Sequence, residues 1–219
     1  MLEAIDIRKS YKKIEVLKGV SIAVNKSDLV CIVGASGAGK STLLHIIGTL
    51  EKPDSGQLRI MGTDTSLLKG NELAKFRNKH IGFVFQFHNL LPEFTALENI
   101  CIPGYIQKES KKKVIDKAMG LMELLKISHR KDHKPNELSG GEQQRTAVAR
   151  ALINSPAIIF ADEPSGNLDS NNADSLHQLF LDLKKELKQT FIIATHNPSL
   201  ASMADRIIEI KDGIVTQNQ

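Results

Sequence analysis

Strands are the first elements that the pattern of apolar positions predicts. Ile5 and Ile7 alternate with charged residues, and the apolar residues of segment 20–24 alternate with small or polar ones. An alternation with period two is typical of half-buried strands, most often antiparallel ones. The start of the chain is therefore predicted to form antiparallel β structure.

A second apolar pattern is continuous. Leu29–Val33 is an unbroken apolar run followed by glycines, and similar runs occupy 157–161, 191–194 and 81–85. Such runs are typical of strands buried on both faces of a parallel sheet. Amphipathic helical patterns separate them, most clearly at 170–188. Strands that alternate with helices predict an α/β layer fold.

Residues 87–137 lack strong strand runs and are predicted to be a helical insertion. Apolar residues of segment 114–125 form a helical stripe, and four lysines lie before it or beside it. We expect these lysines on a solvated helix face, with contact to anionic lipid as the alternative. The prediction is one domain over 1–219, with a core at 1–86 and 138–219 and a helical subdomain at 87–137.

The last residues predict a hairpin, because an Asp-Gly pair at 212–213 separates two short apolar runs.

Composition and charge then limit the class of protein to which the chain can belong. With 41% hydrophobic and 25% charged residues, the 219-residue chain fits a globular protein and excludes wholesale disorder. The net charge of +4 permits an anionic ligand. We expect no nucleic acid, since a nucleic-acid binder usually concentrates its charge more.

The cellular compartment can also be predicted. No apolar run approaches the roughly 18 residues of a membrane helix, and the N-terminus lacks the pattern of a signal peptide. Cys31 and Cys101 lie too far apart to form a metal-binding CxxC pair. They are expected to be reduced thiols in a cytoplasmic protein.

A phosphate-binding loop is the most specific motif. It follows a predicted buried strand, precedes a helical segment and matches GxxxxGK[ST]. Its residues are Gly34, Ala35, Ser36, Gly37, Ala38, Gly39, Lys40 and Ser41. Glycines let backbone N–H groups surround phosphate oxygens, and the helix start adds positive potential. Lys40 can bridge the β- and γ-phosphates, and the Ser41 hydroxyl can bind Mg²⁺.

Two carboxylates end the predicted strand near residue 160. Asp162 and Glu163 follow an apolar run, and ligands of open parallel sheets bind beyond the carboxyl ends of the strands. Asp162 is therefore predicted to face the Mg²⁺, and Glu163 to orient and deprotonate an attacking water. The alternative is an ordinary acidic turn.

The segment Leu138-Ser-Gly-Gly-Glu142 begins a helical pattern. Ser139 and Glu142 fit a capping box, so one interpretation is an ordinary helix start. Gly140 and Gly141 leave its N–H groups uncovered, so an anion can approach. Since the chain already has a phosphate loop, this second start is predicted to serve the nucleotide of another copy.

A phosphate loop, an LSGGE segment and an acidic strand end, in this order along the chain, resemble the ATP-binding cassette family over nearly the whole chain. The resemblance implies a P-loop NTPase of cassette type, with a mixed or parallel sheet core, an N-terminal antiparallel β subdomain and an inserted α-helical subdomain. It also implies ATP and Mg²⁺ as ligands. Two chains would form a head-to-tail dimer, each ATP lying between one chain's phosphate loop and the other's LSGGE.

Further roles follow from the resemblance residue by residue. Tyr11 corresponds to the aromatic residue that stacks on adenine, and Thr42 continues the phosphate loop. Gln86 corresponds to the glutamine that touches Mg²⁺ and water and senses the transporter partner. Asp169 corresponds to the aspartate that communicates across the dimer, and His196 to the histidine at the γ-phosphate.

Two residues depart from the family pattern. Ala38 replaces a more usual serine or cysteine, with little effect expected because the loop backbone makes the main contacts. Asn197 follows His196 where many members have aspartate, which is expected to change the position of the histidine without abolishing it.

The branch of the family is predicted from size and from one segment. The chain has room for a single cassette without added domains, which implies an ATPase that works with separate integral membrane subunits. Residues 81–100 resemble the ATPase subunits of lipoprotein-releasing systems of Gram-negative bacteria. The alternatives are a cell-division regulator and a macrolide-export ATPase. We expect two copies at the cytoplasmic side of the inner membrane, in contact with lipid only through their partners.

Overall fold

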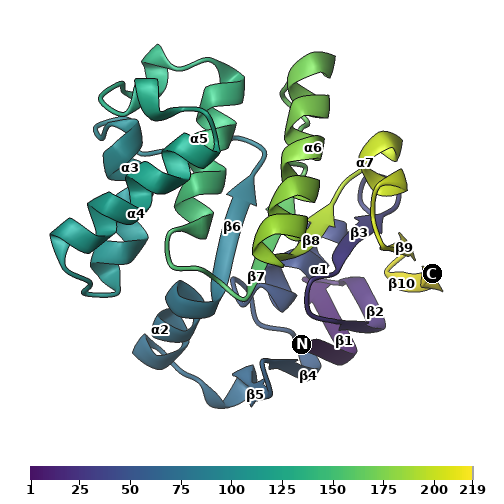
Figure 1. Ribbon diagram of the computed structural model, residues 1–219. Coiled ribbons are helices and arrows are strands. Elements are labelled where there is room, and N and C mark those ends of the chain that lie inside the picture. The colour runs from purple at the N-terminus through teal and green to yellow at the C-terminus, as the bar shows by residue number, and fades with distance from the viewer. Residues whose placement is uncertain (219) are drawn as a thin grey trace. The chain divides into compact units, whose positions relative to one another are not determined.

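The computed structural model describes residues 1–218 (Figure 1). The chain forms two compact units, residues 1–77 together with the chain from 183 onward, and residues 78–182. The boundaries fall within helices α2 (Asn71–His80) and α6 (Ser170–Leu187). In residues 1–218 no helix is both long and apolar enough to span a bilayer. The predicted division into a core and a subdomain at 87–137 stays a prediction.

The first unit contains an antiparallel sheet with the strand order β2-β1-β4-β5. Its strands are β1 (Leu2–Tyr11), β2 (Ile14–Val24), β4 (Ser55–Ile60) and β5 (Thr63–Asp64). The predicted alternation at 20–24 is confirmed, because Val20, Ile22 and Val24 are all buried. A short 3-10 turn, Thr65–Leu67, follows β5.

The alternation predicted for β1 is wrong at Ile5. Ile7 is buried as expected, but Ile5 is 51% exposed, while Leu2 and Ala4 are buried. The pairing register of β1 with β2 shifts between Ala4 and Ile7, and Asp6 has a φ of 49°. This bulge inserts one residue and moves Ile5 to the opposite face of the strand.

The remaining strands of the first unit carry the predicted phosphate loop. β3 (Leu29–Val33) pairs in parallel with β8 (Thr190–Ala194) and β9 (Arg206–Lys211), and β10 (Ile214–Asn218) pairs antiparallel with β9. The β9–β10 turn confirms the predicted Asp-Gly hairpin, with positive φ at both turn residues. Helix α1 (Lys40–Ile47) follows β3 and buries its apolar side chains against this unit. A short helix, α7 (Pro198–Ser202), follows β8.

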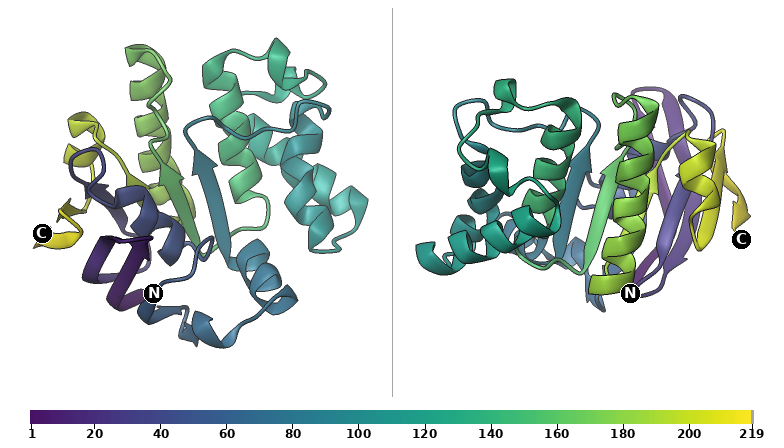
Figure 2. Two further views of the ribbon diagram at one scale, coloured as in Figure 1. Left: turned by 180° about the vertical axis from the view of Figure 1, so that it is seen from behind. Right: turned by 45° about the horizontal axis from the view of Figure 1, so that its top comes forward.

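The second unit combines two parallel strands with packed helices. β6 (Ile81–Phe85) pairs with β7 (Ile158–Asp162). The helices α3 (Ala96–Ile106), α4 (Lys111–Leu124) and α5 (Gly140–Leu152) pack on one another, as both views of Figure 2 show. Two 3-10 turns, Ser128–Arg130 and Pro135–Glu137, precede α5. The apolar stripe predicted in segment 114–125 is buried at Val114, Ala118, Met122 and Leu125.

Candidate nucleotide-binding site

The phosphate loop runs from β3 into α1, as predicted, and its glycines meet different demands. Gly34 has a φ of +151°, and a Cβ there would lie 2.2 Å from the Ile210 carbonyl oxygen. Gly39 has a φ of +105°, and a Cβ would lie 2.9 Å from the Leu17 side chain. Gly37 has a φ of +79° with no atom within 4 Å of that position. The first two glycines therefore allow close packing, whereas the third faces open space.

Lys40 places its ammonium over this loop. Its Nζ donates hydrogen bonds to the carbonyl oxygens of Gly34 at 2.9 Å and Ala35 at 3.1 Å. No side chain caps α1, and its first turn has no acidic residue. A lysine cation and a helix start of positive potential suit a phosphate group. The residues present thus fit the phosphates of a nucleotide.

Tyr11 lies at the end of β1 and is 43% exposed. Its hydroxyl donates to Glu51 Oε2 at 2.5 Å, and Lys9 Nζ lies 5.5 Å from the ring centroid. Burial raises the pKa of Tyr11, the bond to Glu51 raises it further, and a bond with the Thr42 side chain opposes both. The predicted adenine-stacking residue and the end of the phosphate loop are therefore neighbours.

His196 follows the carboxyl end of β8, at the edge of the first unit's parallel strands where the phosphate loop begins. Ile32 pairs with Ala194, and the Thr195 N–H donates to the Ile32 carbonyl at 3.0 Å. His196 itself is exposed. Asn197, the residue that departs from the family pattern, caps α7, and its Oδ1 accepts hydrogen bonds from two backbone N–H groups of that helix.

The second unit gathers the other predicted residues of the hydrolytic centre. Phe85 pairs with Asp162, so Gln86 and Glu163 both leave the same edge of the β6–β7 pair. Glu163 has a φ of 44°, an uncommon backbone conformation for this residue type. The Gln86 Nε2 donates to Asn167 Oδ1 at 3.1 Å. Asn167, two residues before Asp169, was not among the predicted site residues.

The start of α5 is a capping box, as predicted. Ser139 Oγ accepts from the Glu142 N–H, and the Glu142 carboxylate accepts from the Ser139 N–H at 2.8 Å. Glu142 also receives a 2.7 Å bond from Arg130. Burial opposes ionisation, but the hydrogen bonds from Ser139 and Arg130 lower the pKa of Glu142 to about 2.

This helix start lies beside the segment that contains Asp169. A Cβ at Gly141 would lie 2.9 Å from Asn172 Oδ1, and Asn172 donates to both carboxylate oxygens of Asp169. Ser139 and Gly140 are exposed. The structure therefore brings Ser139, Gly140, Gly141 and Asp169 together on one part of the second unit.

The predicted Mg²⁺ ligands come from both units. Ser41 lies in the first unit, and Asp162 and Gln86 lie in the second. Within residues 1–218 no three acidic, histidine or cysteine side chains gather into a metal site. A hydroxyl, a carboxylate and an amide oxygen are ligands that suit Mg²⁺ bound chiefly by phosphate and water.

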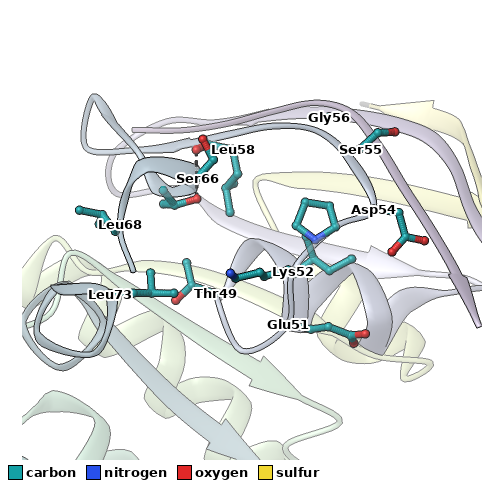
Figure 3. A pocket seen from close by; sticks show the side chains of 13 residues that line it. Thr49, Glu51, Lys52, Asp54, Ser55, Gly56, Leu58, Ser66, Leu68 and Leu73 are labelled. Atoms are coloured by element: carbon teal, nitrogen blue, oxygen red, sulfur yellow. Dashed lines mark hydrogen bonds between the residues drawn. The ribbon is translucent and has the colours of Figure 1, made fainter. Parts of the chain in front are cut away.

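A cavity of about 200 Å³ opens in the first unit after α1 (Figure 3). Apolar side chains from Ile46, Leu58 and Leu73 line it together with polar residues of segment 49–56. None of the predicted site residues lines this cavity. Glu51 borders it and accepts the Tyr11 hydrogen bond.

Two side chains, Asn99 and Arg150, hold the backbone of the loop after Gln86 by hydrogen bonds that the sequence does not predict. The fully buried Asn99 bonds through its amide to Leu91, Phe94 and Thr95 backbone groups. Arg150 donates to the carbonyls of the two residues after Phe87, at 2.7 and 2.6 Å. No sequence signal marks either anchor, because a polar residue on a helix usually indicates a solvated face.

Comparison with known proteins agrees with this arrangement. The ABC transporter family profile matches residues 17–166. The chain belongs to the ABC transporter family, the class of ATP-binding cassette ATPases, and its fold is the α/β cassette fold that the motifs predict.

Particular relatives are similar over the full length. A protein from Cytophaga hutchinsonii, "Lipoprotein-releasing system ATP-binding protein LolD", is 55% identical over 98% of both chains. A protein of the same name from Bacteroides thetaiotaomicron is 54% identical over 100% of both. Among solved structures, the ATP-binding cassette MJ0796, a dimer in a post-hydrolysis state bound to ADP and phosphate, is 40% identical with a TM-score of 0.92, over 100% of this chain and 98% of that one.

Proposed function

We propose that this chain is the ATP-hydrolysing subunit of a membrane complex that releases lipoproteins from the inner membrane towards the outer membrane. The observation that carries this proposal is the full-length similarity to lipoprotein-releasing ATPases, at 55% identity over 98% of each chain. The complete set of cassette motifs supports hydrolysis as the source of energy. The activity is that of a translocase, which couples ATP turnover to movement of a cargo.

ATP binding is assigned mainly to the first unit. The loop from Gly34 to Ser41, with Thr42, holds the phosphates, and Lys40 exchanges its two carbonyl partners for phosphate oxygens. Tyr11 stacks on the adenine. Ser41, Asp162 and Gln86 would hold Mg²⁺ together with phosphate, and the ion would neutralise charge on the phosphate oxygens.

Hydrolysis is assigned to three side chains. Glu163 accepts a proton from the attacking water, and its position directly after β7 supports this role. Gln86 orients the same water through its amide. His196 donates a hydrogen bond to the γ-phosphate.

Two copies of the chain form the working ATPase. Ser139, Gly140 and Gly141 of one copy bind the γ-phosphate held by the other, and Asp169 contacts the partner copy. The exposure of Ser139 and Gly140 at the glycine-rich start of α5 supports this assignment. The dimer binds two integral membrane subunits at the cytoplasmic face of the inner membrane and contacts no nucleic acid.

A chromosomal replacement tests the proposed function. Cells whose only copy carries Lys40→Ala are expected to retain lipoproteins in the inner membrane, as measured by membrane fractionation. The wild-type chain should co-purify with lipoprotein-handling membrane subunits. Normal lipoprotein distribution, or co-purification with division proteins in place of those subunits, would contradict the proposal.

A further inference from the structure

The side-chain amides of Gln86 and Asn167 form a reciprocal pair in the second unit. Gln86 Nε2 donates to Asn167 Oδ1 at 3.1 Å, and Asn167 Nδ2 donates to the Gln86 backbone carbonyl at 3.2 Å. The two residues are 81 positions apart in the sequence. The pair therefore connects the segment after β6 to the turn that follows Glu163.

The chemistry of the pair determines which way each amide points. A backbone carbonyl only accepts, so the Asn167 group that faces it must be the NH₂ group. The Asn167 oxygen then faces Gln86, and an oxygen requires a donor. Gln86 must consequently present its NH₂ group to Asn167, and its Oε1 is turned away from this contact.

The turn that carries Asn167 is closed by hydrogen bonds that do not involve the Gln86 side chain. They run from the Gly166 N–H to the Glu163 carbonyl and from the Leu168 N–H to the Ser165 carbonyl. Ser165 is buried, and its hydroxyl lies 3.0 Å from Nε2 of His177, which is fully buried on α6. A fixed turn can orient a mobile side chain.

Gly166 leaves room for the Gln86 amide. A Cβ at position 166 would lie 2.8 Å from Gln86 Nε2 and 3.2 Å from its Cδ. The φ of Gly166 is not in the left-handed region, so alanine is compatible with the backbone there. The Gln86 amide makes the closest contact with this position, and the Glu163 carbonyl oxygen follows at 3.3 Å.

We propose that Asn167 is a positioning residue that holds the Gln86 amide with Oε1 presented to the metal and the water. This inference rests on the proposed function, since it explains how Gln86 performs its role. An oxygen ligates Mg²⁺ and an NH₂ group does not, so a rotated amide would be inactive as a ligand.

The first test observes the amide directly. In ¹⁵N-labelled protein, the Gln86 side-chain NH₂ signals should show one proton protected from solvent exchange. Asn167→Ala, and separately Gly166→Ala, should remove that protection. Gly120→Ala is the control, because a Cβ at this exposed position of α4 would meet nothing within 4 Å. Unchanged Gln86 signals in Asn167→Ala would overturn the proposal.

The second test measures the metal's contribution to binding of a non-hydrolysable ATP analogue, as the ratio of affinities with Mg²⁺ and with EDTA. Asn167→Ala should reduce this ratio about fivefold, the size expected for one hydrogen bond. Adding Asn167→Ala to Gln86→Ala should cause no further reduction. A further reduction would show that Asn167 acts independently of Gln86 and would overturn the proposal.

The two tests distinguish a failure of this inference from a failure of the proposed function. If the wild-type chain binds no nucleotide, the proposed function is wrong, and the NH₂ signals still decide whether Asn167 orients the amide. If Gln86→Ala leaves the ratio unchanged, Gln86 is not a ligand, and the positioning role toward the metal is overturned.

Discussion

Lys40 is a residue whose present contacts indicate its function. Its ammonium is bonded to two loop carbonyls, which are weaker partners for a cation than phosphate oxygens. In the proposed function, ATP would replace these neutral acceptors with charged ones at little structural cost, because the side chain already lies over the loop.

Lys40→Ala is expected to weaken ATP binding by at least about tenfold, since a hydrogen bond to a charged group contributes roughly 1.5–3 kcal/mol. Isothermal calorimetry provides the measurement. Lys185→Ala, an exposed lysine on α6, is the matched control and should bind normally. Near-normal ATP affinity of Lys40→Ala would show that the phosphate loop does not bind the nucleotide.

Tyr11 allows stacking to be separated from hydrogen bonding. Tyr11→Phe keeps the ring, loses the hydroxyl with its bonds to Glu51 and Thr42, and is expected to keep its ATP affinity. Tyr11→Ala removes the ring and should cost about 1–3 kcal/mol, the usual range for base–aromatic stacking. A fluorescent adenine nucleotide measures both variants, and equal affinities of the two would exclude stacking.

At the scale of elements, the sequence predicts the buried strands better than it predicts the exposed surface. The runs at 29–33, 81–85, 157–161 and 191–194 all form strands, because no other common element buries a short run on both faces. Helix α2 was not predicted from the sequence, because its mostly polar segment shows no clear apolar stripe, and the helix contains no buried residue.

In the candidate site, too, some features could be predicted from the sequence and others could not. The motif residues could be predicted, because a glycine-rich loop with a lysine, followed later in the chain by carboxylates at a strand end, is typical of a nucleotide-binding site. The contact that orients Gln86 could not, because its partner Asn167 lies 81 positions further along the chain. Such contacts depend on packing that spacing alone does not describe.

The capping box of α5 predicts a pH-dependent stability. The pKa of Glu142 falls from an ordinary value of 4.5 to about 2. Its stabilising contribution is therefore complete above about pH 4.5 and disappears as the pH falls through about 2.

Glu142→Gln should accordingly lower the free energy of unfolding at pH 7 by about 1 kcal/mol, the usual size of a capping effect. Urea denaturation at pH 7 and at pH 3 should show the difference from wild type shrinking at the lower pH. Glu186→Gln, an exposed carboxylate on α6, is the control. A difference that is equal at both pH values would contradict the role of the ionised carboxylate.

At the scale of the whole molecule, the proposed coupling to membrane subunits predicts an apolar docking surface near Gln86. Phe87, Leu91 and Phe94 are 73%, 42% and 40% exposed, on the loop that Asn99 and Arg150 hold. Such exposure on an ordered loop is typical of a binding surface for a helix of a partner. Leu90 is half-buried and contributes less.

The variant Phe87→Asp/Phe94→Asp should weaken co-purification with the membrane subunits and leave ATP affinity unchanged. Ile106→Asp is the matched control, because this residue at the end of α3 is 65% exposed away from that loop. If the double variant folds and co-purifies at the wild-type yield, the loop is not the docking surface.

The central claim is that two copies of this chain enclose ATP between a phosphate loop and the LSGGE helix start. Size-exclusion chromatography of Glu163→Gln with Mg-ATP tests it most directly, since the amide cannot accept the proton from water and ATP persists. We expect a dimer that is absent without ATP, and that is lost when Ser139→Arg is added. A monomer with ATP bound, or a dimer that Ser139→Arg leaves intact, would contradict the account.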